Sequence, residues 1–338
     1  MGATRPTAVT TGSDDAVMRR ILTIDGGGIR GVIPATLLAA LEVRTARPVR
    51  ETFDFVSGTS TGAILTAGLV AGIPAERLAS LYVDRAPDLL RRVPILSVLS
   101  RILRGSMFDT RQLRDLIRDE LGPHADWTLN DSPIDLLVTA KRLSDGMPWY
   151  FVRDDPANSC RAGAFRIADA VTASAAAPTY FPPWPVPPIG ELIDGGIGVA
   201  GNPAYQACVE AFEYTDAYEP ASTIVVSLGT GQFLRRPRPS WLWPWLGWLL
   251  SELLRSPAEQ QTELVHRHYR LAAFYRIDVA LDHDVGLEDT DRLGEMRELG
   301  ERLAGTVDWT TILDGTNDRF RVTDATTLPR EYCRLGPG

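Results

Sequence analysis

The chain has few cysteines, few histidines, a surplus of acidic residues and no long hydrophobic run. Its 338 residues include three cysteines without a C-x-x-C pair, which argues against a disulfide framework or a zinc site. The formal net charge of −8 argues against a nucleic-acid polymer as partner, because phosphate binding needs clustered Lys and Arg. No run of 18 apolar residues occurs, so the sequence predicts no bilayer-spanning helix.

These absences also bear on compartment and domain organisation. The N-terminus lacks the charged and apolar regions of a signal peptide, so residues 1–18 are predicted to be a flexible tail. Residues 19–338 are expected to form one domain, in which 232–338 are an extension of uncertain role. Widely spaced, unpaired cysteines fit a reducing cytoplasm, and no residue cluster suggests a metal or a cofactor.

Short β-branched runs alternate with segments of helical periodicity. The predicted strands are residues 19–24, 53–57, 134–143, 149–153 and 222–231, and the predicted helices are residues 32–46, 62–72, 75–90, 109–121 and 166–177. Strands that alternate with helices are typical of a mostly parallel sheet covered on both faces. The sequence therefore predicts the α/β fold class.

The first of two glycine-rich corners is IDGGGIRG, residues 24–31. It satisfies G-x-G-x-x-G and stands between a strand and a helix, so a nucleotide-binding protein is one alternative. Asp25 and Arg30 disfavour that alternative, because neither residue is typical of the dinucleotide fingerprint. Consecutive glycines let main-chain N–H groups approach a ligand at a helix N-terminus, and the ligand can be a phosphate or an oxyanion.

The second corner is Gly58-Thr59-Ser60-Thr61-Gly62, a G-x-S-x-G sequence between a strand and a helix. That context is the one a nucleophile elbow requires, and Gly58 and Gly62 are expected where the tight turn leaves no room for a Cβ. The simpler alternative is a glycine-rich turn in which Ser60 only caps the helix. A glycine-rich anion site nearby favours the nucleophile.

A serine nucleophile needs a base, and the four histidines lie outside the glycine-rich corners. His266 and His268 occupy a polar, helix-like run, and a triad that uses one of them remains an alternative. The better candidate is Asp194, which ends an apolar run directly before Gly195 and Gly196. A partly desolvated carboxylate has a raised pKa and is a better base than in water. The alternative for Asp194 is an ordinary Asp-Gly turn.

The motifs DGGGIRG, GTSTG and DGG, in this order, resemble the patatin-like phospholipase family. TASAAAPTYFPP (172–183) and SLGTG (227–231) add to the resemblance, which covers roughly residues 19–231. It implies a three-layer α/β/α fold with a mostly parallel central sheet. The sequence departs from many relatives at 201–203, where Gly-Asn-Pro replaces Asn-Asn-Pro; we expect this change to affect loop support more than chemistry.

The resemblance also implies an activity and roles for the residues that match the motifs. The activity is phospholipase A-type hydrolysis of acyl esters of membrane glycerolipids, with Ser60 as nucleophile and Asp194 as base. The amides of Gly26, Gly27 and Gly28 would form the oxyanion hole, held by Arg30, without a metal or a cofactor. Some relatives are bacterial antiviral effectors activated by cyclic oligonucleotides, so a small nucleotide activator and a homo-oligomer are left open.

A phospholipase must reach a membrane, and two segments are candidates for that contact. One segment is tryptophan-rich and follows three arginines; its tryptophans are Trp241, Trp243, Trp245 and Trp248. The other segment, residues 89–108, carries four arginines and no acid amid apolar residues. Tryptophan beside arginine suits the headgroup boundary, so we expect a cytoplasmic, peripherally membrane-associated protein. The alternative is that both segments pack on the core or on a second subunit.

Overall fold

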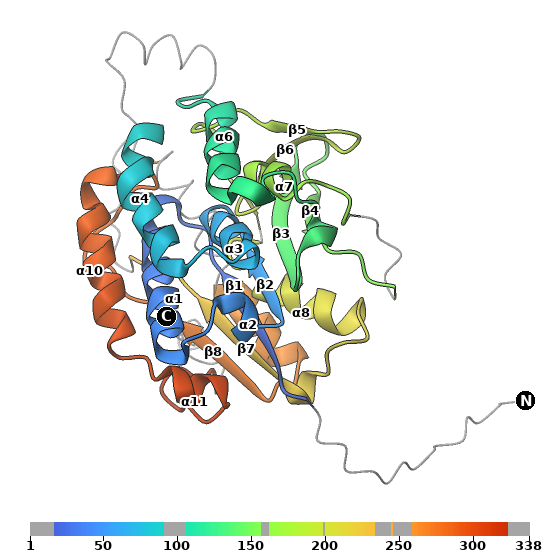
Figure 1. Ribbon diagram of the computed structural model, residues 1–338, viewed down its shortest axis with the longest axis vertical. Coiled ribbons are helices and arrows are strands. Elements are labelled where there is room, and N and C mark those ends of the chain that lie inside the picture. Colours follow the sequence, from blue (N-terminus) through green and yellow to red (C-terminus); the bar gives the residue numbers. More distant parts are fainter. Residues whose placement is uncertain are drawn as a thin grey trace, which may run out of the picture.

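An eight-stranded sheet forms the centre of the computed structural model (Figure 1). The structure describes residues 17–90, 106–156, 162–198, 200–233, 245 and 259–323. Most of the predicted N-terminal tail, most of the segment 89–108, and Trp241, Trp243 and Trp248 lie outside the described residues.

The sheet has a parallel half and an antiparallel half. Its strands are β1 (Arg19–Ile24), β2 (Phe55–Gly58), β3 (Asp135–Arg142), β4 (Pro148–Val152), β5 (Trp184–Val186), β6 (Gly190–Asp194), β7 (Thr223–Leu228) and β8 (Ala273–Ile277). The order is β5-β6-β3-β2-β1-β7-β8, and β4 pairs with β3. All pairings from β3 through β2, β1 and β7 to β8 are parallel, whereas β4, β5 and β6 join by antiparallel pairing.

Helices cover both faces of the sheet. The α-helices are α1 (Val32–Thr45), α2 (Val49–Thr52), α3 (Thr61–Ala71), α4 (Ala75–Leu89), α6 (Thr110–Leu121), α7 (Ile167–Ser174), α8 (Ala204–Glu213), α10 (Leu293–Ala304) and α11 (Trp309–Leu313). The side chains of β1 alternate between two buried clusters, since Leu22 belongs to the larger and Ile21 to the smaller. The larger cluster includes residues of α1, α3 and α10, and the smaller includes residues of α8, so the arrangement has three layers.

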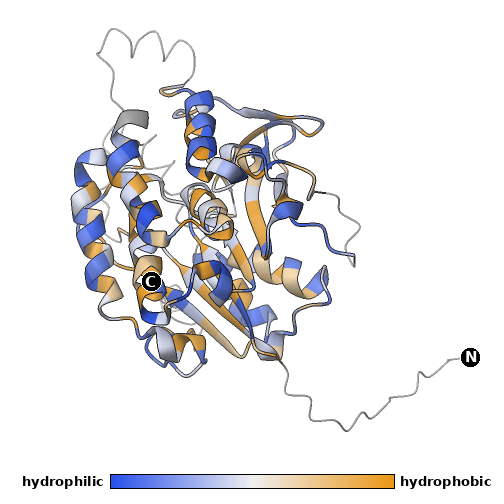
Figure 2. Cartoon of the chain, in the orientation of Figure 1, coloured by the Kyte–Doolittle hydropathy of each residue, from blue (hydrophilic) through white to orange (hydrophobic). Residues whose placement is uncertain are grey.

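The hydropathy of the elements follows this layering (Figure 2). The central strands are mostly hydrophobic, whereas α4, α6 and α10 alternate between hydrophilic and hydrophobic residues. Such alternation is expected of helices that pack one face on a core and expose the other. Among the described residues, none of the helices combines the length and the hydropathy needed to cross a bilayer.

The prediction of a mostly parallel α/β fold is confirmed, and most predicted elements are present within a few residues of the expected bounds. The last predicted helix, 166–177, is shorter than expected, because α7 ends at Ser174. The short strands β5 and β6 were not predicted as strands, and neither was β8. β8 lies in the region expected to be an extension, yet it pairs with β7 in the main sheet, and α10 packs against α1.

The register of β3 explains how its neighbours meet at one point. β2 pairs with the first half of β3 and ends at Gly58, opposite Val138. β6 pairs with the second half of β3, where Asp194 lies opposite Ala140. β4 pairs with the opposite edge of β3 at both Val138 and Ala140. β2 and β6 therefore lie along the same edge of β3, one after the other. The end of β6 therefore lies beside the turn that follows β2.

Candidate active site

The serine of the second glycine corner has an unusual backbone. Ser60 has φ 54° and ψ −118°, a conformation that is costly for a residue with a side chain. It stands between β2 and the first turn of α3, and its N–H donates to Ser174 Oγ at 2.9 Å. Strained residues of this kind persist where the surrounding structure holds them, commonly at functional sites. The strand–turn–helix context of a nucleophile elbow is therefore present.

Gly58 and Gly62 lie where the backbone comes too close to neighbouring atoms for a Cβ. A Cβ at Gly58 would lie 2.1 Å from the Gly62 carbonyl oxygen. A Cβ at Gly62 would lie 2.2 Å from the carbonyl oxygen of Ile24 in β1. Real Cβ atoms do not tolerate such distances, so both positions need glycine for the elbow to sit against β1.

Asp194 meets Ser60 although 134 residues separate them in the sequence. The Ser60 hydroxyl lies close enough to the Asp194 carboxylate to lower its pKa, and the Gly196 N–H donates to Asp194 Oδ1 at 2.7 Å. Asp194 is 2% exposed, and burial raises its pKa to about 6 against the lowering effect of Ser60 and the Gly196 N–H. Its described partners are neutral donors, so this carboxylate is suited to accept a proton.

The first glycine turn lies directly over the serine. A Cβ at Gly26 would come within 3.3 Å of Ser60 Cβ. The Gly26 N–H donates to the Gly201 carbonyl at 2.9 Å, so it is not free for an oxyanion, contrary to the expectation that all three glycine amides contribute. The N–H groups of Gly27 and Gly28 have no acceptor among the described residues.

Neighbouring elements hold this turn from two sides. Arg30 donates from Nε to the Gly27 carbonyl at 3.2 Å and from Nη1 to the Gly231 carbonyl at 3.2 Å. Gly28 has φ 59°, and a Cβ there would lie 2.3 Å from the Leu287 carbonyl oxygen. That carbonyl accepts the N–H of Ile29 at 2.9 Å. Leu287 lies in the C-terminal region, so this region contributes to the site.

An apolar cavity of about 130 Å³ opens beside Ser60 and Asp194. Most of the lining is aliphatic or aromatic and comes from α3, α4 and α6, including Ile64, Leu78 and Leu113. Gly27 and Gly28 also line the cavity, so the unpaired amides, the hydroxyl and the carboxylate share one space.

None of the four histidines lines this cavity. His268 Nδ1 is bonded to the Tyr205 hydroxyl at 2.8 Å, His266 lines a separate polar pocket, and His283 pairs with Glu295 at 3.2 Å. The ring of His124 packs on Trp127. This placement favours Asp194 over a histidine as the partner of Ser60.

Two other expectations concern metals and tryptophans. In the part of the chain that the structure describes, no group of three His, Cys, Asp or Glu side chains is placed to hold a metal ion. Trp245 is the one member of its tryptophan-rich segment within the described residues, and it is helical and 40% exposed.

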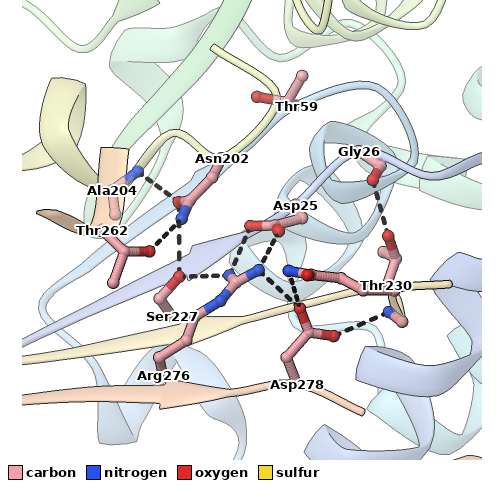
Figure 3. Close-up of polar contacts among 12 residues, drawn as sticks. Asp25, Gly26, Thr59, Asn202, Ala204, Ser227, Thr230, Thr262, Arg276 and Asp278 are labelled. Carbon is pink, nitrogen blue, oxygen red and sulfur yellow. Dashed lines mark hydrogen bonds and ion pairs between the residues drawn. The ribbon is translucent and has the colours of Figure 1, made fainter. Parts of the chain in front are cut away.

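Arg276 and Asp278 were not predicted as site residues from the sequence. Arg276 lies in β8 and Asp278 directly follows it, and both side chains lie under the glycine turn (Figure 3). Arg276 forms two hydrogen bonds to Asp25, of 2.9 and 2.6 Å, and one to Asp278 of 2.9 Å. A signal was present in FYRIDVA, since two opposite charges two residues apart lie on one face of a strand. Charged residues inside an apolar strand need a buried partner, and Asp25 provides it.

Comparison with known proteins places this site in a family. The profile of the patatin-like phospholipase family matches residues 22–208, which include both glycine corners and Asp194. The chain belongs to this family. It is 34% identical over 201 residues to a cGAMP-activated phospholipase of Escherichia coli, a match that covers 57% of this chain and 56% of the relative.

Further matches describe how far the similarity extends. A cGAMP-activated phospholipase of Vibrio cholerae is 32% identical over 207 residues, which cover 57% of this chain and 58% of the relative. The chain thus spans little more than half the length of these two relatives. The crystal structure of VipD from Legionella pneumophila superposes with a TM-score of 0.41 at 12% identity, covering 86% of this chain and 67% of VipD.

Proposed function

We propose that this protein is a lipid acyl hydrolase of phospholipase A type, in which Ser60 is the nucleophile and Asp194 its base. One observation carries the proposal. The Ser60 side chain lies beside the buried Asp194 carboxylate, at the wall of an apolar cavity that also presents the unpaired amides of Gly27 and Gly28. The family membership supports the same reaction class.

The first half-reaction follows from these positions. Ser60 Oγ attacks the ester carbonyl carbon while Asp194 takes the hydroxyl proton. The carbonyl oxygen becomes an oxyanion and accepts hydrogen bonds from the Gly27 and Gly28 N–H groups, each worth about 3–4 kcal/mol in a comparable hydrolase. The tetrahedral intermediate collapses with cleavage of the ester C–O bond. Asp194 gives its proton to the departing alkoxide, which leaves as the lysolipid alcohol.

The second half-reaction returns the enzyme to its starting state. Water attacks the acyl-Ser60 carbonyl while Asp194 takes one of its protons. The second tetrahedral intermediate collapses, Ser60 Oγ leaves and takes the proton back from Asp194, and the fatty acid is released. The apolar lining of the cavity favours an acyl chain over a polar group, because burial of apolar surface is favourable and burial of an unpaired polar group is costly.

Fatty-acid release tests this function. The protein is incubated with liposomes of mixed phospholipids, and fatty acids and lysolipids are identified by mass spectrometry. Release is expected from the wild type, and Ser60→Ala is expected to abolish it. Ser222→Ala changes a serine at the opposite end of the sheet and serves as the matched control. Equal release by the wild type and by Ser60→Ala would refute the proposal.

The proposal includes a small nucleotide activator, which the names of two relatives support, since both are cGAMP-activated phospholipases. The same liposome assay is run with and without cGAMP. Stimulation of the wild type and of Ser222→Ala, but not of Ser60→Ala, is the expected result. Unchanged fatty-acid release at saturating cGAMP would reject this nucleotide as activator.

We further propose that the protein is cytoplasmic and reaches its substrate as a peripheral membrane protein. The 40% exposed side chain of Trp245 supports a contact made by its tryptophan-rich segment. Replacement of Trp241, Trp245 and Trp248 together is expected to reduce liposome binding in a flotation assay while hydrolysis of a soluble ester stays near wild type. Unchanged flotation would reject this surface as the contact.

A further inference from the structure

A network of buried charged side chains joins the glycine turn that follows β1 to the glycine turn that follows β7 (Figure 3). Its centre is Arg276, on the edge strand β8. The guanidinium holds both oxygens of Asp25 and also donates to Asp278 and to Ser227 Oγ. Side-chain exposure is only 13% for Arg276, 7% for Asp25 and 15% for Asp278. The ion pairs are therefore largely shielded from solvent, so salt screens them less than it would screen a surface pair.

At one end of this network, Asp25 is joined to the glycine turn of residues 26–28 through the backbone. Asp25 directly precedes Gly26, and its own N–H donates to the Leu228 carbonyl of β7 at 3.0 Å. Its carboxylate is bound by two nitrogens of one planar guanidinium, a geometry that fixes orientation as well as distance. The first residue of the turn is thus held at both its main chain and its side chain.

The other end reaches the same turn through Asp278. Oδ1 of Asp278 accepts the Gly231 N–H at 2.9 Å, and Oδ2 accepts Gln232 Nε2 at 3.0 Å. The Gly231 carbonyl accepts Arg30 Nη1, and Arg30 Nε holds the Gly27 carbonyl. Arg276 therefore reaches both flanks of the turn, through Asp25 on one side and through Asp278, Gly231 and Arg30 on the other.

Thr230 closes the connection between the two glycine turns. Its hydroxyl donates to the Gly26 carbonyl at 2.8 Å, and a Cβ at Gly27 would lie 2.2 Å from the same hydroxyl oxygen. Glycines carry no side chains that fix a turn, and they have more backbone freedom than other residues. Contacts with neighbouring elements must therefore fix the conformation of a turn of three glycines, and the contacts described above do so.

We infer that Arg276 and Asp278 are positioning residues of the reaction, which aim the Gly27 and Gly28 amides at the developing oxyanion. This inference rests on the proposed hydrolase function. Preorganised donors lower the transition-state free energy only when they stand where the charge develops. Neither side chain lines the substrate cavity, so their loss should affect the transition state far more than substrate binding.

The test compares Arg276→Met and Asp278→Asn with Arg19→Met. The control breaks the Arg19–Asp54 pair (2.8 Å) at the opposite end of β1. For a soluble short-chain ester, we expect kcat to fall on the order of 100-fold in each test variant, as for a misplacement of about 1 Å, with KM changed less than about threefold. Arg276→Lys keeps the charge but not the planar, two-pronged guanidinium, so its kcat should lie between those of the wild type and of Arg276→Met.

Affinity for an acyl trifluoromethyl ketone separates positioning from general stability. This inhibitor forms a hemiketal with the nucleophilic serine and places an oxyanion in the hole. Its affinity should fall by the same factor as kcat/KM in the test variants and should stay constant in Arg19→Met. If Asp278→Asn, the isosteric variant, folds and keeps both kcat and inhibitor affinity within twofold of wild type, the inference is wrong.

Hydrogen exchange tests the positioning without any turnover. The amides of Gly26 and Ile29 are bonded to Gly201 and Leu287, and both bonds should open more often in the test variants. Faster exchange in the peptide 24–31 is expected in Arg276→Met and Asp278→Asn, but not in Arg19→Met. If the wild type hydrolyses no ester either with or without cGAMP, the proposed function fails, whereas exchange still decides whether these residues order the turn. Unchanged exchange would overturn the positioning.

Discussion

The tetrapeptide Ile-Asp-Gly-Gly occurs twice, at residues 24–27 and 193–196, and the two copies differ in what surrounds the aspartate. Both aspartates end a strand or follow it directly, and both are buried, with 5% of the whole residue exposed for Asp25 and 2% for Asp194. Burial raises both pKa values to about 6. Asp25 is held by the guanidinium of Arg276, whereas the described partners of Asp194 are neutral donors.

The comparison teaches that burial alone does not assign a role to a carboxylate. A carboxylate bound by a guanidinium fork has its lone pairs occupied and its charge balanced, which suits it to fix the backbone. A carboxylate that lies beside a hydroxyl and accepts one amide N–H keeps capacity to take up a proton. The same four residues can therefore support a turn at one strand end and provide a base at another.

The largest expected effect separates the two aspartates by activity. Asp194→Asn should lower kcat for ester hydrolysis on the order of 1000-fold, since general-base catalysis contributes about 10²–10⁴-fold. Asp25→Asn should lower kcat far less, because this variant keeps Asp194, the proposed base. Steady-state kinetics on a soluble ester checks this order, and the comparison breaks if Asp25→Asn is the more damaging of the two.

For stability the order should be reversed: Asp25→Asn should lower the free energy of unfolding more than Asp194→Asn does. Asp25→Asn weakens a buried ion pair, and the loss of such a partner costs up to about 3–5 kcal/mol of unfolding free energy. Asp194→Asn removes a buried charge that has no counter-ion among the described residues, so it should leave stability unchanged or increase it. Urea unfolding of both variants measures the difference, and equal losses would mean that the two environments are energetically alike.

The pH dependence sharpens the comparison further. Because Asp194 must be ionised to act as base, kcat/KM should rise about tenfold per unit up to about pH 6 and then level off. Its contribution to stability has the opposite sign. The pKa is raised above its ordinary value of 3.8, so the native state binds the proton more tightly than the unfolded chain does. Stability from this group is therefore present below about pH 4 and is lost as pH rises through about 6.

Asp25→Asn provides the control for that profile. The activity profile of this variant should keep its inflection near pH 6, because Asp194 is unchanged. An inflection that disappears with Asp25 would assign the titration to the other copy of the tetrapeptide.

The smallest expected effect concerns the histidines. His266→Ala and His268→Ala should leave kcat/KM within about twofold of wild type, since surface substitutions away from a site rarely matter. Neither side chain lines the cavity that contains Ser60 and Asp194. A loss of nearly all activity in either variant would revive a histidine-containing triad.

Local patterns were sufficient to predict much of the fold. Residues 19–24 have the β-branched composition of a strand, and the structure has β1 at Arg19–Ile24. The glycines at 58 and 62 predicted a tight turn, which close backbone contacts explain. Short strands such as β5 and β6 carry too few residues for a periodic signal, so the sequence alone did not predict them.

The sequence by itself determined the strand–turn–helix elbow at Ser60, the glycine turn at 26–28 and the presence of a buried acid at 194, since each depends on neighbouring residues. Only the tertiary structure shows which aspartate of the two identical tetrapeptides lies against the serine. β6 fills the edge of β3 that β2 leaves, which brings Asp194 to Ser60, while β8 brings Arg276 to Asp25. Sheet pairing joins residues that are far apart in the chain, and no local pattern encodes that partner choice.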